Sequence, residues 1–154
     1  MSQPEASVPR LEPAFRVEVE LGPLEDHGTT RAGHRRVVPI VGGSVHGDLE
    51  GEILPGGADW QIVRADGAVE VDGRYSMRTR DGALVYLQAV GIRSGSPEVL
   101  EALLRGDAVE PDSYYFRTVV TIESSTRPEL ERSLYVASCV RDANRVRYVA
   151  YRVT

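Results

Sequence analysis

The stretch RADGAVEVDGRYSMRTRDGALVYLQAVGIR, residues 64–93, carries the clearest structural signal in this 154-residue chain. Asp66-Gly67 and Asp81-Gly82 are tight-turn signals that would join neighbouring strands. Between these turns apolar and charged side chains alternate, which is the period of a half-buried strand. The apolar positions are Val69, Val71, Tyr75 and Met77, and the charged positions are Glu70, Asp72, Arg74 and Arg78. The segment therefore predicts an antiparallel meander.

Similar patterns on both sides of this meander predict further strands and one helix. The strands are expected over residues 15–21, 35–40, 44–53, 59–64, 84–92, 114–124, 134–140 and 146–153. The polar segment 24–33 is expected to be a long connection, and the two glycines at 42–43 a turn. A helix is expected after Ser96, which suits the N-cap, with Pro97 in its first turn and Gly106 at its exit.

These elements predict an all-β fold, an antiparallel closed or nearly closed β-barrel of about 8–10 strands with one short α-helix. A closed barrel is preferred to an open sheet because closure removes exposed strand edges. Residues 1–13 contain three prolines and no apolar period, so we expect a flexible N-terminal tail there. Residues 14–154 are then expected to form a single β-barrel domain.

Composition limits the class of protein. The net charge is −5 and the arginines are scattered along the chain, so nucleic acid is not expected as a partner. Cys139 is the only cysteine, which excludes an internal disulfide and fits a reducing compartment. No stretch approaches the roughly 20 apolar residues that span a bilayer, and no export signal is visible. We therefore expect a cytoplasmic protein without a membrane partner.

Three segments resemble a known family. They are GTTRAGHRRVVPIVGGSVHGDLEGEILPGGADWQ (28–61), DGAVEVDGRYSMRTRDGALV (66–85) and YYFRTVVTIES (114–124). With them the chain resembles the uncharacterised microbial barrel family catalogued as domain of unknown function 3237 (DUF3237, UPF0311-like proteins). The resemblance implies a compact antiparallel barrel. It also implies a catalytic or ligand-binding role on a small organic molecule, by analogy alone.

Asp59 and Trp60 form the first candidate site. In a functional interpretation, the Trp60 indole forms the floor of a pocket and Asp59 transfers a proton. Desolvation beside the indole would raise the pKa of the Asp59 carboxyl group, which suits it to this role. In a structural interpretation, Asp59 caps the preceding turn and Trp60 fills the core. The strand period directs the two side chains to opposite faces, so they converge only if the strand bends.

The strand over 114–124 offers two faces. If its polar face lines the cavity, Tyr115, Arg117 and Glu123 would serve as anchor and acid/base groups. If that face points to solvent, the three side chains are ordinary surface groups. Tyr75 lies on an apolar face, where its hydroxyl needs a partner and could also donate to an oxyanion.

The function hypothesis is a small-molecule enzyme, a non-covalent acid/base isomerase or cyclase, or a related addition/elimination lyase, in secondary metabolism or catabolism. Its substrate would be a partly apolar organic molecule in the barrel pocket, with no cofactor and no metal. The candidate catalytic residues are Asp59, Glu123 and Tyr75. The candidate substrate-binding residues are Trp60, Tyr115, Arg117, Arg36 and His46.

Two alternatives stay open at this point. One is a non-catalytic binding or carrier barrel with the same cavity. The other is a barrel filled by its own side chains, which the lack of a cavity of roughly 300 Å³ would favour. The strand over 84–92 is largely apolar on both faces, so we expect it to be covered on both sides, by the helix or by a second subunit. A homo-oligomer, such as a dimer, is therefore also open.

Overall fold

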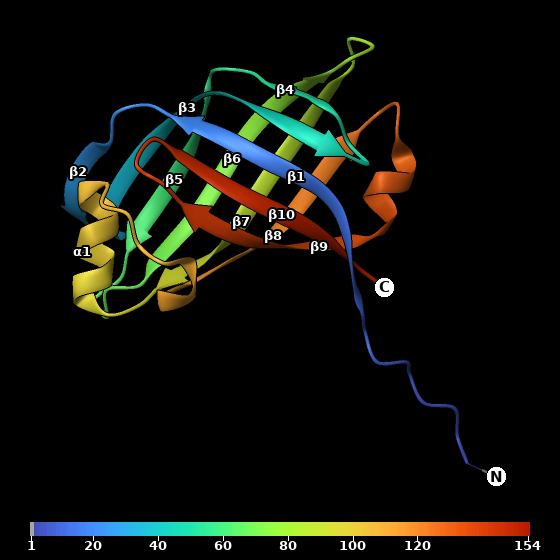
Figure 1. Cartoon of the computed structure of the whole chain (residues 1–154), viewed down its shortest axis with the longest axis horizontal. Helices are drawn as coiled ribbons and strands as arrows, with labels where there is room; N and C mark the ends of the chain where they lie inside the picture. The colour runs from blue at the N-terminus through green and yellow to red at the C-terminus, as the bar shows by residue number, and fades with distance from the viewer. Residues whose placement is uncertain (1) are drawn as a thin grey trace.

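The computed structural model describes residues 2–154, which form a closed eight-stranded antiparallel barrel with two extra strands and one α-helix (Figure 1). The strands are β1 (Leu11–Leu21), β2 (Glu25–Thr30), β3 (Gly33–Gly47), β4 (Gly51–Ile53), β5 (Gly57–Val63), β6 (Val69–Thr79), β7 (Leu84–Ser94), β8 (Tyr115–Ser124), β9 (Leu134–Arg141) and β10 (Arg145–Val153). The helices are α1 (Pro97–Arg105) and the 3₁₀ turns η1 (Pro111–Ser113) and η2 (Pro128–Arg132). The predicted all-β barrel is confirmed.

The long strand β3 closes the barrel. Its first half pairs with β5, and its second half pairs with β1 and β4. The strand bends at Gly43, whose φ of 142° is unfavourable for other residues, so the expected turn at 42–43 is a bend within one strand. The chain turns instead after Gly47, which splits the expected 44–53 strand into the end of β3 and the short β4.

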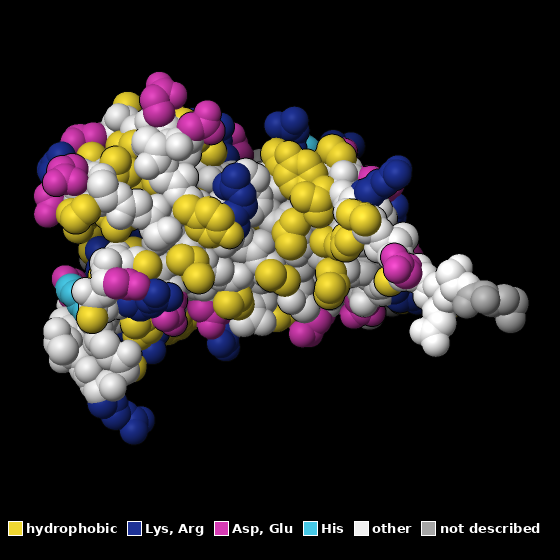
Figure 2. All heavy atoms as spheres, turned by 90° about the horizontal axis from the view of Figure 1, so that it is seen from below, with side chains coloured by type: hydrophobic (Ala, Val, Ile, Leu, Met, Phe, Trp, Pro, Cys, Tyr) yellow, Lys and Arg dark blue, Asp and Glu magenta, His cyan; other side chains and the backbone are white. Residues whose placement is uncertain are grey.

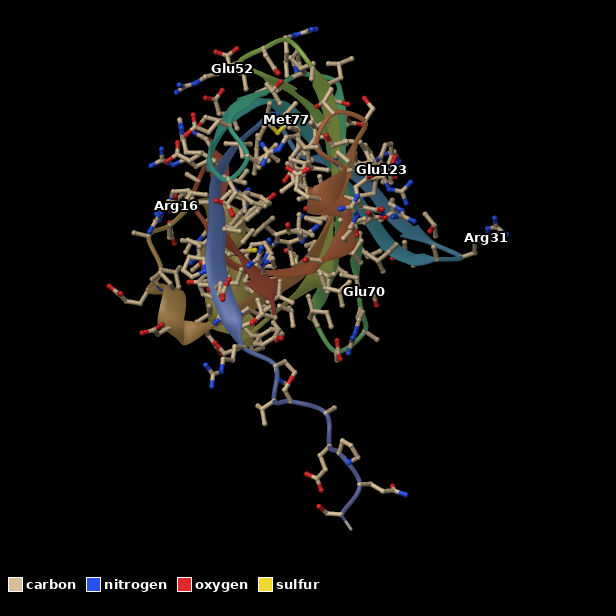
Figure 3. The ribbon with its side chains drawn as sticks, turned by 90° about the vertical axis from the view of Figure 1, so that its right-hand side faces the viewer. Arg16, Arg31, Glu52, Glu70, Met77 and Glu123 are labelled. Atoms are coloured by element: carbon tan, nitrogen blue, oxygen red, sulfur yellow. The ribbon has the colours of Figure 1, made fainter. Side chains whose placement is uncertain are left out.

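The segment expected to be a long connection, 24–33, holds a strand instead. Residues of β2 pair with the first half of β3, and a bulge lies between Asp26 and Gly28. The polar composition hid this strand because both of its faces are largely exposed to solvent. The β2–β3 hairpin projects from the barrel, with Arg31 at its tip (Figure 3).

The barrel interior is the hydrophobic core, and the predicted alternation places it correctly. Met77 lies inside the barrel while Glu123 points away from its wall (Figure 3). The most completely buried large side chains are Leu49, Met77, Leu87, Val17, Val45 and Val85. They come from β1, β3, β6, β7 and the β3–β4 turn, and buried side chains of β8, β9 and β10 complete the same core cluster, so closure, rather than a second layer, buries the core.

Helix α1 covers one end of the barrel, where β5 meets β6 and β9 meets β10 (Figure 1). This is the α1 end of the barrel. The predicted caps are confirmed, since the Ser96 side chain accepts from the Val99 N–H at 3.2 Å and Gly106 has a φ of 83°. Because α1 lies at the end, it does not cover the outer face of β7. Leu84, Val90 and Ile92 are 58, 46 and 39 % exposed, so the helix, one of the two covers expected for this strand, does not cover its outer face.

Strand β1 begins at Leu11, earlier than the expected Phe15, because residues 11–13 pair with the end of β10. The Arg10 N–H also donates to the Thr154 carbonyl at 2.9 Å. Residues 2–9 run away from the barrel (Figure 1). Within residues 2–154, no helix has the length and apolar character needed to cross a membrane.

Candidate functional site

A small cavity lies inside the barrel towards its α1 end. Its volume is about 40 Å³, which is the space of a few water molecules and well below the roughly 300 Å³ of a typical ligand pocket. Its lining is apolar except for a few groups that include a carboxylate, a hydroxyl pair and a thiol. The lining residues are Val19, Leu21, Ile40, Asp59, Val71, Gly73, Tyr75, Ala89, Phe116, Thr118, Cys139, Val146 and Tyr148.

Asp59 supplies the carboxylate of this cavity. It lies on β5 opposite Val38 of β3, and period two directs it inward. Its two oxygens accept hydrogen bonds from Gln61 Nε2 at 2.8 Å and from the Asp72 backbone N–H at 2.9 Å. Burial raises the pKa of the Asp59 carboxyl, although these two hydrogen bonds and the charge of Arg93 act in the opposite direction. The carboxylate is thus held in one orientation and is more basic than an exposed aspartate.

Three arginines from separate strands lie at the same end of the barrel. Arg36, Arg93 and Arg141 come from β3, β7 and β9, and desolvation lowers the pKa of each guanidinium, that of Arg93 to about 10. The Arg93 guanidinium lies 5.2 Å from the centre of the Phe116 ring, which itself lines the cavity. The cationic cluster and the apolar cavity are therefore adjacent.

Tyr75 and Tyr148 meet inside the barrel, where their hydroxyls form a hydrogen bond with each other. Burial raises both pKa values, so the pair stays neutral at ordinary pH. Cys139 lies on the same wall, and burial raises the pKa of its thiol to about 11. A thiol with this pKa is a poor nucleophile.

The structure brings together three of the residues proposed from sequence and leaves five outside. Asp59 and Tyr75 line the cavity, and Arg36 lies in the neighbouring arginine cluster. The side chains outside the barrel are Trp60, Tyr115, Arg117, Glu123 and His46. This corrects their expected place in the pocket.

The strand period explains these outer positions. Trp60 is 45 % exposed because its neighbour Asp59 takes the inner face. It lies in an outer groove of about 500 Å³ beside the β2–β3 hairpin. On β8 the inner positions belong to Phe116 and its alternates, so the Arg117 guanidinium lies 5.6 Å from the exposed Tyr115 ring instead. His46 is exposed at the end of β3.

Arg93 and Arg141 were missed by the sequence reasoning. A signal was available, since Arg93 continues the inner face of β7 and Arg141 shares a face with Cys139. As for metals, residues 2–154 contain no group of three or more histidine, cysteine, aspartate or glutamate side chains placed to hold an ion.

Comparison with known proteins decides the family. The profile of the family described as Protein of unknown function (DUF3237) matches residues 9–153. The chain belongs to this family. The resemblance inferred from the three segments is thereby confirmed. The UPF0311 protein blr7842 of Bradyrhizobium diazoefficiens is 40 % identical to this DUF3237 protein over 134 residues, which cover 86 % of this chain and 88 % of that protein.

Solved structures share the barrel. The conserved protein of unknown function RPA1785 from Rhodopseudomonas palustris matches the DUF3237 chain with a TM-score of 0.90 and 36 % identity, over 97 % of this chain and 100 % of that one. A β-barrel-like protein from Acinetobacter baumannii matches with a TM-score of 0.84 and 41 % identity, over 99 % and 100 %. An enzyme from Penicillium herquei matches over 99 % and 100 % with a TM-score of 0.70, and its 18 % identity supports the fold alone.

Proposed function

We propose that this DUF3237 barrel is a small-molecule enzyme in which Asp59 transfers a proton to and from a compact, partly apolar organic substrate. The observation that carries the proposal is the position of the half-buried Asp59 carboxylate, which lies in the wall of an apolar cavity and is fixed by two hydrogen bonds. Buried carboxyl groups with raised pKa values are a recurrent feature of acid/base sites.

The chemistry suited to this arrangement is isomerisation, cyclisation or a related addition/elimination without a covalent intermediate. Asp59 would remove a proton from one substrate atom and return it to another, so no electrons are gained or lost. The Tyr75–Tyr148 hydroxyl pair lines the same cavity and would donate a hydrogen bond to a substrate oxygen that gains negative charge. Neither step requires an organic cofactor.

The cavity limits the substrate. A volume of about 40 Å³ takes one functional group or a short apolar end, so the rest of a larger substrate would lie outside the cavity. The same volume favours a second candidate, a barrel filled by its own side chains that binds nothing. An experiment on Asp59 must therefore distinguish a catalytic barrel from a filled barrel that binds no ligand.

Hydrogen–deuterium exchange measured by proton NMR tests the proposal. Compact ketones and 1,3-dicarbonyl compounds are incubated with the protein in deuterium oxide, and the exchange rate of their C–H bonds is measured. We expect exchange above the buffer rate for at least one compound, and a decrease of about 10² to 10⁴ in Asp59→Asn. Glu123→Gln is the matched control, because this exposed carboxylate lies outside the barrel and its loss should leave exchange unchanged.

Two outcomes would contradict the proposal. In the first, no compound exchanges faster with the protein than in buffer and none shifts its thermal midpoint, which favours the filled barrel. In the second, exchange is accelerated equally by the wild type and by Asp59→Asn, which would show that a group other than Asp59 transfers the proton.

A further inference from the structure

We infer that Arg36, Arg93 and Arg141 form an anion subsite at the α1 end of the barrel, which binds the carboxylate group of a small organic acid. The inference rests on the proposed function, because it names the substrate class of the same cavity. It follows from the burial of Arg36 and Arg93, their unused Nε donors, the lack of a direct ion pair at any of the three guanidinium groups, and the apolar wall beside Arg93. Arg141 is half-buried, and its guanidinium donates to the Asp142 and Ala143 carbonyls.

Two of the three arginines are buried with a donor left unused. Arg36 and Arg93 are only 7 and 6 % exposed. Their Nε atoms have no hydrogen-bond partner anywhere in residues 2–154. A buried guanidinium with a free donor carries a desolvation penalty that a bound anion would offset. The two donors therefore mark a place where a ligand atom is expected.

None of the three arginines forms a direct ion pair in residues 2–154. Asp59 interacts electrostatically with all three arginines, but no pair within 4.0 Å joins it to any of them. Asp26 acts in the same way on Arg36, and Asp142 on Arg141, again without a pair within 4.0 Å. The three guanidinium groups therefore lack a carboxylate in direct contact.

The other carboxylates near the cluster are already engaged. Asp26, beside Arg36, accepts a hydrogen bond from His34 at 2.7 Å. Asp142, beside Arg141, accepts from Arg147 Nε at 2.7 Å. Neither carboxylate accepts a hydrogen bond from the buried Nε donors of Arg36 and Arg93.

The neighbourhood indicates a carboxylate on an organic molecule rather than an inorganic anion. Arginine binds planar carboxylates through paired N–H donors. The guanidinium of Arg93 lies against the Phe116 ring, and Phe116 is itself part of the apolar cavity wall. A ligand with a carboxylate at one end and a short hydrocarbon at the other would satisfy both surfaces, whereas phosphate or sulfate would leave the apolar wall uncovered.

Calorimetric titration tests the subsite with acetate, butyrate and benzoate as probes, at constant ionic strength. Butyramide and benzamide are the neutral counterparts, and inorganic phosphate is the inorganic one. We expect at least one acid to bind more than tenfold more tightly than its amide and than phosphate. Binding should weaken more than tenfold in Arg93→Gln and in Arg36→Gln. Arg117→Gln is the matched control, since this arginine lies outside the barrel, and should bind as the wild type does.

The inference is overturned if an amide binds as tightly as its acid, if phosphate binds more tightly than every acid, or if both Arg93→Gln and Arg36→Gln bind acids like the wild type. The comparison of acids with amides uses the wild type, so it decides the matter even where a variant does not fold. No binding of any acid also overturns it.

The two proposals fail in different ways. If acids bind through Arg93 and Asp59→Asn leaves proton exchange unchanged, the subsite stands and the proposed catalysis fails. If Asp59-dependent exchange occurs with neutral compounds and no acid binds, the catalysis stands and the subsite fails. Where both are correct, Asp59→Asn should lose exchange yet bind acids more tightly, because a like charge is removed.

Discussion

Burial of the Asp59 carboxylate makes the stability of the folded protein depend on pH. Because burial raises its pKa, the folded state binds more protons than the unfolded chain between the unfolded pKa, roughly 3.9, and the folded pKa. Stability contributed by the protonated carboxyl is therefore lost as pH rises through this interval. We expect the free energy of unfolding of the wild type, relative to that of Asp59→Asn, to fall in urea titrations as the pH is raised above the unfolded pKa.

Asp66 provides a control of opposite sign. Its hydrogen bonds from Arg64 lower its pKa, so its contribution is present above the unfolded pKa and is lost as pH falls. The free energy of unfolding of the wild type, relative to that of Asp66→Asn, should therefore decrease as the pH is lowered.

For Asp59, the difference in free energy of unfolding between the wild type and Asp59→Asn should decrease as pH rises. A difference that is constant, or that grows with pH, would contradict the burial of an ionisable Asp59.

At the scale of single residues, the strand period predicted the inner or outer side of a residue only where the strand itself was recognised correctly. It placed Asp59 opposite Trp60, as observed. It did not identify Arg93, because a charged residue at the end of an apolar strand has the same local pattern whether it meets solvent or other strands. That choice depends on which strand ends converge, and the convergence comes from closure of the whole barrel.

At the scale of elements, Gly43 is the residue on which the contact between β1 and β3 depends. Its φ is 142°, and a Cβ built there would lie 2.0 Å from the Glu18 carbonyl oxygen of β1. We expect Gly43→Ala to destabilise the protein by roughly 3 kcal/mol or more, since unfavourable φ and a backbone clash add together. Urea unfolding measures the change.

Gly82→Ala is the matched control for this substitution. Gly82 also has a positive φ, 90°, but nothing lies within 4 Å of its added Cβ. It should lose only roughly 1 to 2 kcal/mol. Equal losses at the two glycines would show that the close approach of β1 and β3 does not limit stability.

The elements that local sequence identified best are those whose neighbours in the sheet are also their neighbours in sequence. Strands β6 and β7 pair over ten positions across one tight turn, so turn residues and alternation were sufficient. Strand β3 instead pairs with four other strands, and its bend depends on the distant β1. Two glycines in such a strand look like a turn until the partner is known.

At the scale of the whole molecule, closure of the barrel was predictable, because an open sheet would have left the edges of its outer strands unpaired. The cavity volume was not predictable in the same way. It depends on how side chains such as Tyr75 and Phe116 fill the interior, and alternation fixes only the direction in which they point. The cavity of about 40 Å³ therefore limits the substrate to a degree that the sequence did not indicate.

Hydrophobic side chains also gather on the outside of the molecule (Figure 2). On the outer face of β7 and β8, Val90 lies directly opposite Val119, and the two are 46 and 49 % exposed. Exposed apolar groups on neighbouring strands are typical of an interaction surface. Of the two covers expected for β7, the helix is excluded because α1 lies at the barrel end, and a second copy of the chain stays a prediction.

We therefore propose that the protein forms a dimer through the outer face of β7 and β8, and size-exclusion chromatography with light scattering measures this. The wild type should have twice the chain mass, and Val90→Glu should have the mass of one chain, because a charge would be buried without a partner. Val41→Glu is the control, as this residue is similarly exposed, at 49 %, on β3. A wild type that elutes with the mass of one chain, or a Val90→Glu variant that still dimerises, would exclude this surface.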